Sequence, residues 1–505
     1  MAPPQRDGNR FSVDAANPRG AKVPGRERPR MEKHSTYATR HLPVATDLTR
    51  LGDKARRCPK LVFTSLYHHI SDIDNLRDCF DSLDGRKAVG VDGQTKADYA
   101  ARLEANLRDL SARLARLGYR PQPKRRTYVD KPGSTTKRPL SISTVEDKIV
   151  EEAVKRVLEP LWEPLFRDCS YGYRPHRDAQ QCADRLARTI QQRRITQVVE
   201  ADIRGYFDHV NHEWLIRFLE QRVGDPRVLR LLRRMLKGGI LEDGLVHAPE
   251  AGTPQGSIVS PLLSNIYLHY VLDLWFDKRV QPACRGEAYL FRFADDFVVC
   301  FEHAADAAQF RRRLTDRLDG FSLELAEDKT RTLPFGRHAR RDAHRQGEKP
   351  GQFDFLGFTF YCGKTRRGAF KVKRRTSRKK AAQFLRRFTI WIRSQRHRYR
   401  TGELLARART RLAGHLNYYA ITDNSERCQM VHNATTRVLF KWLNRRSQRS
   451  SYTWTTFTAA LRSAGWPVVR VQHHLCPFRA LPSVHVKSRM WESRLSGSVR
   501  GTGTN

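Results

Sequence analysis

Two adjacent aspartates, Asp295 and Asp296, interrupt an otherwise apolar stretch, FRFADDFVVCF, at residues 291–301. Neighbouring like charges repel each other, and burying a carboxylate without a partner is costly. A third carboxylate, Asp202, stands at the end of a second apolar stretch, QVVEADI. If the ends of these two stretches converge, three carboxylates meet and need a positive counter-charge. Mg²⁺, which prefers carboxylate, phosphate and water oxygens, would supply that charge.

Two magnesium ions about 4 Å apart activate a 3′-hydroxyl and stabilise a leaving pyrophosphate. The three aspartates therefore predict nucleotidyl transfer by in-line displacement. A plain hairpin turn is the alternative interpretation, because Asp is a common turn residue. The flanks argue against it, since a surface turn needs no aromatic residues on both sides. Here the flanking residues are Tyr289, Phe291, Phe293, Phe297 and Phe301.

The apolar pattern indicates the elements that must position these carboxylates. Strands are expected at 198–203, at 287–301 as a pair with the aspartates at their junction, and at 353–360. Helical spacing predicts a helix that ends before Gly118, a helix at 145–166 capped by Thr144, and a helix at 259–276. Strands interleaved with helices favour an α+β domain over residues 61–361.

Composition points to a polyanionic partner. The 505 residues include 94 Lys and Arg against 53 Asp and Glu, a formal net charge of +41. Such a charge fits nucleic acid as the partner. No apolar run is long enough to span a membrane, and the N-terminus lacks the apolar core of a signal peptide. We therefore expect a cytoplasmic protein without a membrane partner.

Outside 61–361 the sequence predicts three further segments. Residues 1–60 are expected to be a mobile basic tail, and 471–505 a C-terminal extension. Residues 371–411 carry sixteen Lys or Arg and one acid, Glu403, and a basic helical domain is expected over 370–470. The nine cysteines lack zinc-site spacing and are expected to be reduced. The role of one compact cluster, His473, His474 and Cys476, stays open.

The order of the sequence blocks resembles a known family. ADIRGYFD at 201–208 and FADD at 293–296 resemble the two metal-binding motifs of reverse transcriptases. Further blocks in the same order resemble group II intron-encoded reverse transcriptase/maturases: KAVGVDGQT, KRPLSISTVEDKIVEEAV, SYGYRPHRDA, GTPQGSIVSPLLSNIYL, LELAEDKT, FDFLGFTF and GHLNYYAITDNS. The resemblance implies a right-hand polymerase fold, with fingers and palm at 61–361 and an all-helical thumb, the maturase domain, at 370–470.

The resemblance also implies residue roles. Two Mg²⁺ ions, with Mn²⁺ as a substitute, would be held by Asp202, the Ile203 carbonyl, Asp295 and Asp296. Nucleotide-binding residues would be Lys131, Arg138, Phe207, Gln255, Gly256 and Lys329, with Phe207 excluding a 2′-hydroxyl. RNA-binding residues would be Tyr173, Arg174, Arg177, Arg386, Arg387, Arg393 and Arg396. For each role outside the three aspartates, an ordinary core or surface residue is the alternative.

The function implied is RNA-directed DNA synthesis, together with binding of the group II intron RNA to assist splicing and retromobility. The expected partners are intron RNA, an RNA template with a DNA primer, dNTPs and target DNA, and a homodimer is left open. No endonuclease domain is expected, because paired cysteines are absent after the thumb. The expected location is the bacterial cytoplasm, at the nucleoid. The alternatives are a splicing cofactor that does not polymerise and a relative adapted to phage defence or CRISPR spacer acquisition.

Overall fold

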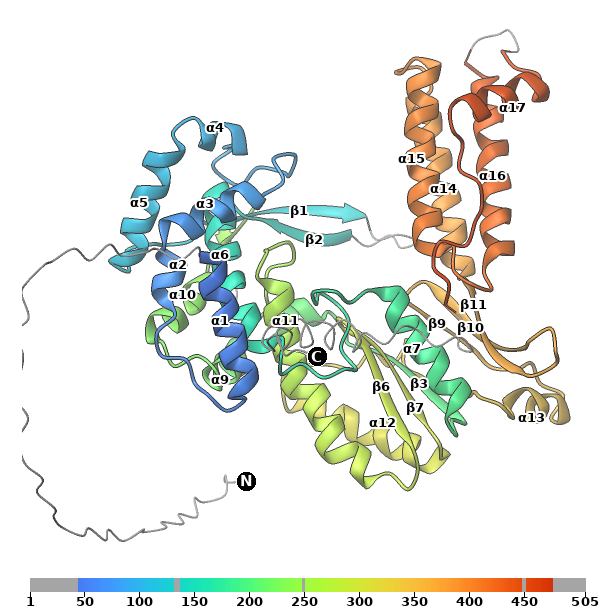
Figure 1. Cartoon of the computed structure of the whole chain (residues 1–505), viewed down its shortest axis with the longest axis horizontal. Coiled ribbons are helices and arrows are strands. Elements are labelled where there is room, and N and C mark those ends of the chain that lie inside the picture. The colour runs from blue at the N-terminus through green and yellow to red at the C-terminus, as the bar shows by residue number, and fades with distance from the viewer. Residues whose placement is uncertain (1–43, 131–136, 248–249, 447–450, 476–505) are drawn as a thin grey trace, which may run out of the picture. The chain divides into compact units, whose positions relative to one another are not determined.

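A computed structural model of the chain describes residues 44–130, 137–247, 250–446 and 451–475 (Figure 1). The described residues from Val44 onward form one compact unit, so the division into palm and thumb stays a prediction. Helices and strands both contribute substantially, as expected for an α+β protein. In these described ranges, no helix has the length and apolar content needed to cross a membrane.

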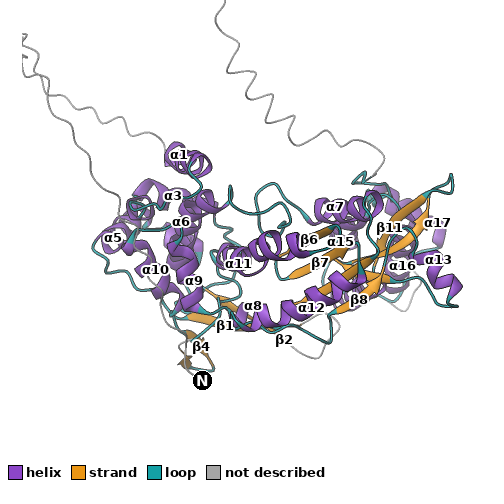
Figure 2. Ribbon diagram, turned by 90° about the horizontal axis from the view of Figure 1, so that it is seen from below, coloured by secondary structure: helices purple, strands orange, loops and turns teal. Residues whose placement is uncertain are grey.

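A four-stranded antiparallel sheet carries the three aspartates. Its order is β6 (Ala288–Phe293), β7 (Asp296–Phe301), β3 (Gln197–Asp202) and β8 (Arg331–Pro334). Side chains alternate between the two faces of β3, so Val199 packs toward α12 (Ala304–Asp319) and Val198 toward α7 (Ala179–Gln192). Figure 2 shows these two helices on opposite sides of the sheet. Asp202 lies on the same face as Val198.

A second sheet corrects two sequence expectations. The expected single strand at 353–360 is a hairpin of β9 (Gln352–Phe355) and β10 (Phe358–Lys364). Leu356 and Gly357 form its turn with φ of +52° and +78°, a conformation that alternation of apolar residues does not reveal. The third strand, β11 (Phe370–Thr376), lies where the helical domain was expected to begin.

The N-terminal part combines helices with a small sheet of order β2 (Lys137–Ile142), β1 (Lys124–Asp130), β4 (Ile240–Glu242) and β5 (Leu245–His247). Helix α1 (Val44–Arg57) lies within the segment expected to be a tail, and its Ala55 is fully buried, so that boundary is corrected. Two of the three expected helices are α5 (Leu103–Ala115) and α6 (Val145–Trp162), and Thr144 caps α6 by accepting a hydrogen bond from Asp147 N–H. The third, expected at 259–276, is present as α11 (Ser260–Leu268), which continues into the π-helix η1 (His269–Asp273). Residues 1–43 lie outside the described residues.

The remaining elements of the N-terminal part and of the sheet domain follow the chain order. They are α2 (Tyr67–Ser71), α3 (Ile73–Ser82), α4 (Lys96–Ala100), β1 (Lys124–Asp130), β2 (Lys137–Ile142), α8 (Tyr206–His209), α9 (His212–Glu220), α10 (Pro226–Leu236), β4 (Ile240–Glu242), β5 (Leu245–His247), α11 (Ser260–Leu268), η1 (His269–Asp273), η2 (Phe276–Val280), η3 (Gln281–Ala283) and α13 (Ala339–Arg345).

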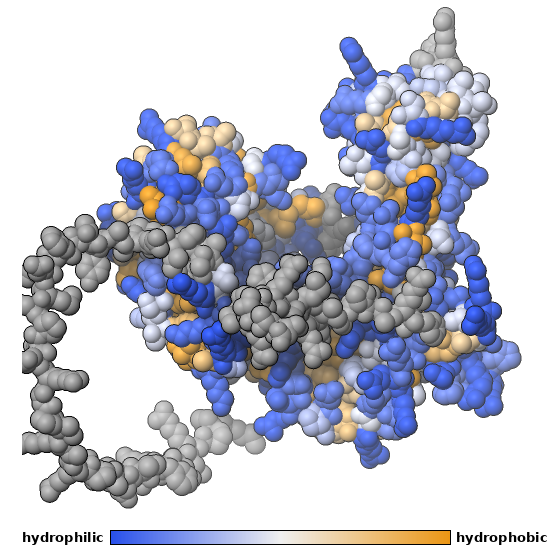
Figure 3. All heavy atoms as spheres, in the orientation of Figure 1, coloured by the Kyte–Doolittle hydropathy of each residue, from blue (hydrophilic) through white to orange (hydrophobic). Residues whose placement is uncertain are grey.

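The described C-terminal part is mainly helical between Arg378 and Ser463. Its helices are α14 (Arg378–Gln395), α15 (Thr401–Tyr419), α16 (Ser425–Leu443) and α17 (Trp454–Ser463). They share a core that includes Phe388, Leu404, Leu439 and Phe457. Hydrophilic side chains cover much of the face shown in Figure 3, in keeping with the many exposed arginines of α14 and α15.

Candidate active site

The three aspartates meet at one end of the sheet. Asp202 and Asp296 are register partners on the antiparallel strands β3 and β7. Asp295 lies in the two-residue turn between β6 and β7, where Ala294 has φ of +58°. All three line a cavity of about 700 Å³. The expected convergence of the two sequence motifs is therefore present in the structure.

The charges in this cavity disfavour three ionised carboxylates. Burial, with the nearby charges of Asp202 and Asp295, raises the pKa of Asp296 to about 8, although the Leu356 N–H lowers it in part. Burial also raises the pKa of Asp295, with Asp202 adding to the effect and Arg138 opposing it. Lys329 Nζ lies 2.5 Å from Asp202 Oδ2. The cavity therefore favours bound positive charge.

The donor set fits a hard divalent ion. Carboxylate oxygens are the ligands that Mg²⁺ prefers, and the three aspartates line the same cavity as Ile203. In the part of the chain that the structure describes, no group of three or more His, Cys, Asp or Glu side chains is arranged to hold a metal ion. Mg²⁺ is usually bound by one or two carboxylates together with water and substrate phosphates, and the number of ions stays a prediction.

Most of the predicted nucleotide-binding residues line the same cavity, namely Arg138, Phe207, Gln255, Gly256 and Lys329. The loop with Gln255 is fixed by β2, because Ser141 N–H donates to the Gln255 carbonyl at 2.6 Å. Gly256 has φ of +109°, and a Cβ there would lie 2.7 Å from Ser141 O. Glycine is thus required for this contact. Lys131 lies outside the described residues.

The predicted RNA-binding residues near Tyr173 differ in how exposed they are and in their partners. Tyr173 is 52% exposed and lines the cavity that the three aspartates share. Arg174, in contrast, is buried, because its guanidinium donates to Glu163 and to backbone carbonyls. Arg177 pairs with Asp168 at 2.8 Å and lies over Tyr171. Placing Arg174 at an RNA-binding surface is therefore corrected, since the aromatic and arginine pattern here is largely structural.

The arginines predicted on the thumb lie on α14 or just after it. Arg386, Arg387 and Arg393 are exposed, while Arg396 lies 4.6 Å from the Trp442 ring centre. His473 of the remaining cluster contacts helix α15, since its Nε2 lies 2.8 Å from the Asn417 carbonyl. Cys476 lies outside the described residues. The eight cysteines in the described ranges are free thiols, as expected.

Comparison with known proteins decides the family. A profile described as reverse transcriptase (RNA-dependent DNA polymerase) matches residues 129–360. The group II intron-encoded protein LtrA of Lactococcus lactis subsp. cremoris is 35% identical over 253 residues, 48% of this chain and 42% of LtrA. Protein YkfC of Escherichia coli strain K12 is 32% identical over 330 residues, 59% of this chain and 83% of YkfC. The chain belongs to the group II intron-encoded reverse transcriptase/maturase family.

Other relatives match over shorter segments. An uncharacterised 91 kDa protein in the cob intron of Schizosaccharomyces pombe is 41% identical over 147 residues, 29% of this chain and 18% of that protein. The aligned region likewise spans less than half of LtrA, at 42%. The matches establish the reverse transcriptase/maturase family and leave the activity and partners of this member to be tested.

Sequence reasoning missed the side chain that anchors the turn with Asp295 in this reverse transcriptase family member. Arg292 is fully buried and forms a two-point ion pair with Asp273 at 2.6 and 2.7 Å. Its guanidinium also donates to Asn265 Oδ1, Ser170 Oγ and the Ala294 carbonyl. Arg292 thus joins three surrounding segments to the turn beside Asp295. The sequence did contain a signal for this burial, namely a single arginine within the apolar stretch YLFRF at residues 289–293.

Two further contacts hold the turn and its aspartates in place. A Cβ on Gly172 would lie 2.4 Å from Ala294 N, so the loop and the turn are in direct contact only because residue 172 is glycine. On the other side, Leu356 N–H donates to the Asp296 carboxylate, and Tyr418 Oη donates to the Leu356 carbonyl at 3.0 Å. The hairpin turn at Leu356 therefore connects helix α15 to an aspartate of the site.

A buried histidine beside this cluster gives a testable pH dependence. Burial lowers the pKa of His269 to about 4 from its ordinary 6.5. Below pH 6.5 the unfolded chain binds a proton that the folded chain does not, so stability is lost as the pH falls toward 4. Thermal melting should show a loss of up to about 1.4 kcal/mol per pH unit for this group. An identical pH profile for His269→Phe would contradict the assignment.

Proposed function

We propose that this chain is an RNA-directed DNA polymerase that acts by two-metal nucleotidyl transfer. The observation that carries the proposal is the placement of Asp202 opposite Asp296, with Asp295 at the adjacent turn, around one cavity of about 700 Å³. Family membership supports the same activity. In this role Asp202, Asp295, Asp296 and the Ile203 carbonyl would hold the ions.

Bound Mg²⁺ would activate a primer 3′-hydroxyl and neutralise charge on the departing pyrophosphate. The chain's own groups position the nucleotide. Arg138 would grip the triphosphate, and Lys329, now 2.5 Å from Asp202, would place a cation beside the phosphates. Gln255 and Gly256 would allow the base pair to approach the loop closely, since no side chain stands at Gly256.

The basic helical part supports a second role in binding intron RNA. Exposed Arg386, Arg387 and Arg393 on α14 offer contacts to RNA phosphates that do not involve the aspartates. We propose that this surface, with the other basic segments, binds the group II intron RNA and assists splicing and retromobility. Target DNA, a homodimer and a bacterial, nucleoid-associated location belong to the same proposal.

Primer extension tests the polymerase assignment. The purified chain, Mg²⁺ and dNTPs are combined with a DNA primer annealed to a generic RNA template, and extension of the primer is expected. Splicing of the flanking intron RNA is measured in parallel. If the parent chain splices the intron without extending the primer on any template, the chain is a splicing cofactor and the polymerase assignment is wrong.

Substitution of Phe207 tests the sugar selectivity. Phe207 is half-buried, lines the catalytic cavity and packs edge-on against Tyr206 at 5.5 Å. Removal of the ring in Phe207→Ala should leave room for a 2′-hydroxyl and lower the preference for dNTP over rNTP by about tenfold or more. Steady-state incorporation of dNTP and rNTP by parent and variant measures the ratio. An unchanged ratio would remove the steric role.

A further inference from the structure

A buried ion pair lies behind the loop that contains Gln255 and Gly256. Lys124 on β1 donates to Glu151 Oε1 on α6, and the two side chains are only 5% and 1% exposed. Removing two charges from water is costly, so a buried pair is weak evidence for a contribution to stability alone. The groups that surround the pair indicate what it does.

The Glu151 carboxylate joins three segments of the chain. Besides Lys124 of β1, its Oε1 accepts a hydrogen bond from Ser143 Oγ, just after β2, at 2.8 Å. Its Oε2 accepts a hydrogen bond from the Ile258 N–H at 2.8 Å. Ile258 lies in the loop before α11. One carboxylate on α6 therefore holds β1, the end of β2 and this loop together.

The loop held by Glu151 contacts the residues proposed to bind the nucleotide. Ser141 N–H of β2 donates to the Gln255 carbonyl at 2.6 Å, three residues before Ile258. Nearer the start of the loop, Thr253 N–H donates to the Phe207 carbonyl at 2.7 Å. Strand β2 also contains Arg138, which lines the same cavity as Gln255 and Phe207. The position of the loop therefore decides how these side chains lie relative to one another.

The donors around Glu151 require an ionised carboxylate. Burial raises the pKa of Glu151, but Lys124 and the hydrogen bonds from Ile258 and Ser143 outweigh this effect, and the pKa lies below its ordinary value of 4.5. An ionised carboxylate only accepts hydrogen bonds, so it suits three donors. A glutamine keeps one accepting oxygen, whereas a leucine keeps none. These two replacements therefore separate the hydrogen bond to the loop from the charge.

We propose that Glu151 is a positioning residue for nucleotide binding, which holds residues 252–258 against β2 so that Gln255 and Gly256 lie in register with Arg138. The inference rests on the proposed polymerase function. Glu151 acts through the loop, since it touches neither the three aspartates nor the cavity that they line. Its loss should therefore change the binding of dNTP and leave the chemical step nearly unchanged.

Hydrogen–deuterium exchange tests the hold on the loop without any nucleotide. Two variants remove both buried charges, Lys124→Met/Glu151→Gln and Lys124→Met/Glu151→Leu, and only the first keeps an acceptor for the Ile258 N–H. Exchange in a peptide that covers residues 252–258 should be about tenfold faster in the leucine variant, as expected for one lost hydrogen bond. The glutamine variant should stay near the parent. Melting temperatures confirm that both variants are folded.

Single-nucleotide incorporation on a primed RNA template tests the consequence for the reaction. The leucine variant should raise the KM for dNTP by about tenfold and keep kcat within about twofold, because a loss of uniform binding acts on KM alone. The glutamine variant should restore the KM to within about twofold of the parent. A merely structural defect would lower the active fraction, and so kcat, without this selective change in KM.

An ion pair on the same helix provides the matched control. Glu152 and Lys155 of α6 are 3.3 Å apart, with side chains 15% and 32% exposed. Glu152→Leu/Lys155→Met should change neither the loop exchange nor the KM. Equal loop exchange in the leucine and glutamine variants would overturn the proposal, as would an equal KM in both. Absence of extension by the parent would instead overturn the polymerase function, and the exchange measurement would still decide whether Glu151 holds the loop.

Discussion

Asp296→Asn is expected to abolish primer extension while making the metal-free protein more stable. Loss of a carboxylate ligand for the ions should lower the rate by at least about 10³-fold. The stability gain has a different cause, because burial and the two neighbouring aspartates raise the pKa of Asp296 to about 8. Asparagine removes that unfavourable charge and still accepts the Leu356 N–H.

The sign of the pH dependence distinguishes this explanation from a general stabilisation. The folded pKa lies above the ordinary value of 3.8, so the parent loses stability as the pH rises through about 8. In EDTA, the melting temperature of Asp296→Asn should exceed that of the parent by more at pH 9 than at pH 6. Asp342→Asn, at a side chain that is 49% exposed, serves as a control that should change neither property. Extension by Asp296→Asn at the parent's rate would contradict the catalytic role.

Arg292→Met is expected to destabilise the protein by about 3–5 kcal/mol, because it leaves Asp273 buried without its partner. The double variant Arg292→Met/Asp273→Leu removes both charges and should recover most of this loss. Extension should remain low in the double variant, since the donors to Ala294 and Asn265 are still absent. Chemical denaturation and primer extension measure the two effects separately.

An exposed ion pair provides the comparison for this buried one. Arg233 and Glu220 are 3.0 Å apart, with side chains 49% and 43% exposed. Arg233→Met should therefore cost less than about 1 kcal/mol. Full extension by a stable Arg292→Met/Asp273→Leu protein would show that the cluster supports folding alone. In that case Arg292 would not position the catalytic turn.

The elements around the aspartates could be predicted from sequence because local signals agreed there. Alternation of apolar residues indicated the strands now seen as β3, β6 and β7, and the cap at Thr144 indicated the start of α6. The resemblance of the motif order to that of reverse transcriptases then predicted that Asp202 lies near Asp295 and Asp296. These signals depend on residues that are close in the chain, so a single sequence is sufficient to recognise them.

The parts that could not be predicted depend on contacts between distant segments. The turn at Leu356 and Gly357 has the same apolar flanks as a continuous strand, so one strand was expected where the structure has two. Arg174 looks like a surface cation until Glu163 is found beside it. The burial of Arg292 likewise depends on Asp273 and Ser170, which other segments bring to it.

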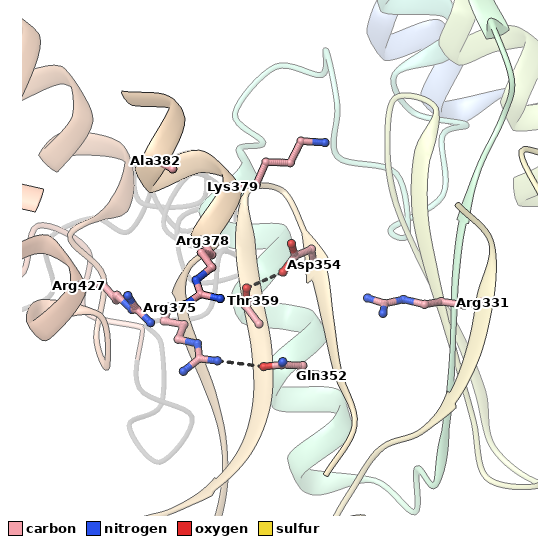
Figure 4. A pocket seen from close by; sticks show the side chains of 9 residues that line it. All are labelled: Arg331, Gln352, Asp354, Thr359, Arg375, Arg378, Lys379, Ala382 and Arg427. Carbon is pink, nitrogen blue, oxygen red and sulfur yellow. Dashed lines mark hydrogen bonds between the residues drawn. The ribbon is translucent and has the colours of Figure 1, made fainter. Parts of the chain in front are cut away.

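A cavity lined by Arg331, Arg375, Arg378, Lys379 and Arg427, among other residues (Figure 4), shows the same limit of sequence reading. Its cations come from β8, β11, α14 and α16, which span almost a hundred residues of the sequence. Read along the chain, these arginines are indistinguishable from the many others in a protein of net charge +41. Only their position around one cavity separates them from a solvated basic surface.

Direct measurement of metal binding is the sharpest test of the central claim that the three aspartates form a divalent-ion site. Mn²⁺ binding is measured by electron paramagnetic resonance at pH 8.5, with a dNTP present and without nucleic acid. The parent is expected to bind two ions per chain, and Asp202→Asn and Asp296→Asn are each expected to lose this binding while remaining folded. Equal Mn²⁺ binding by the parent and both variants would contradict the account.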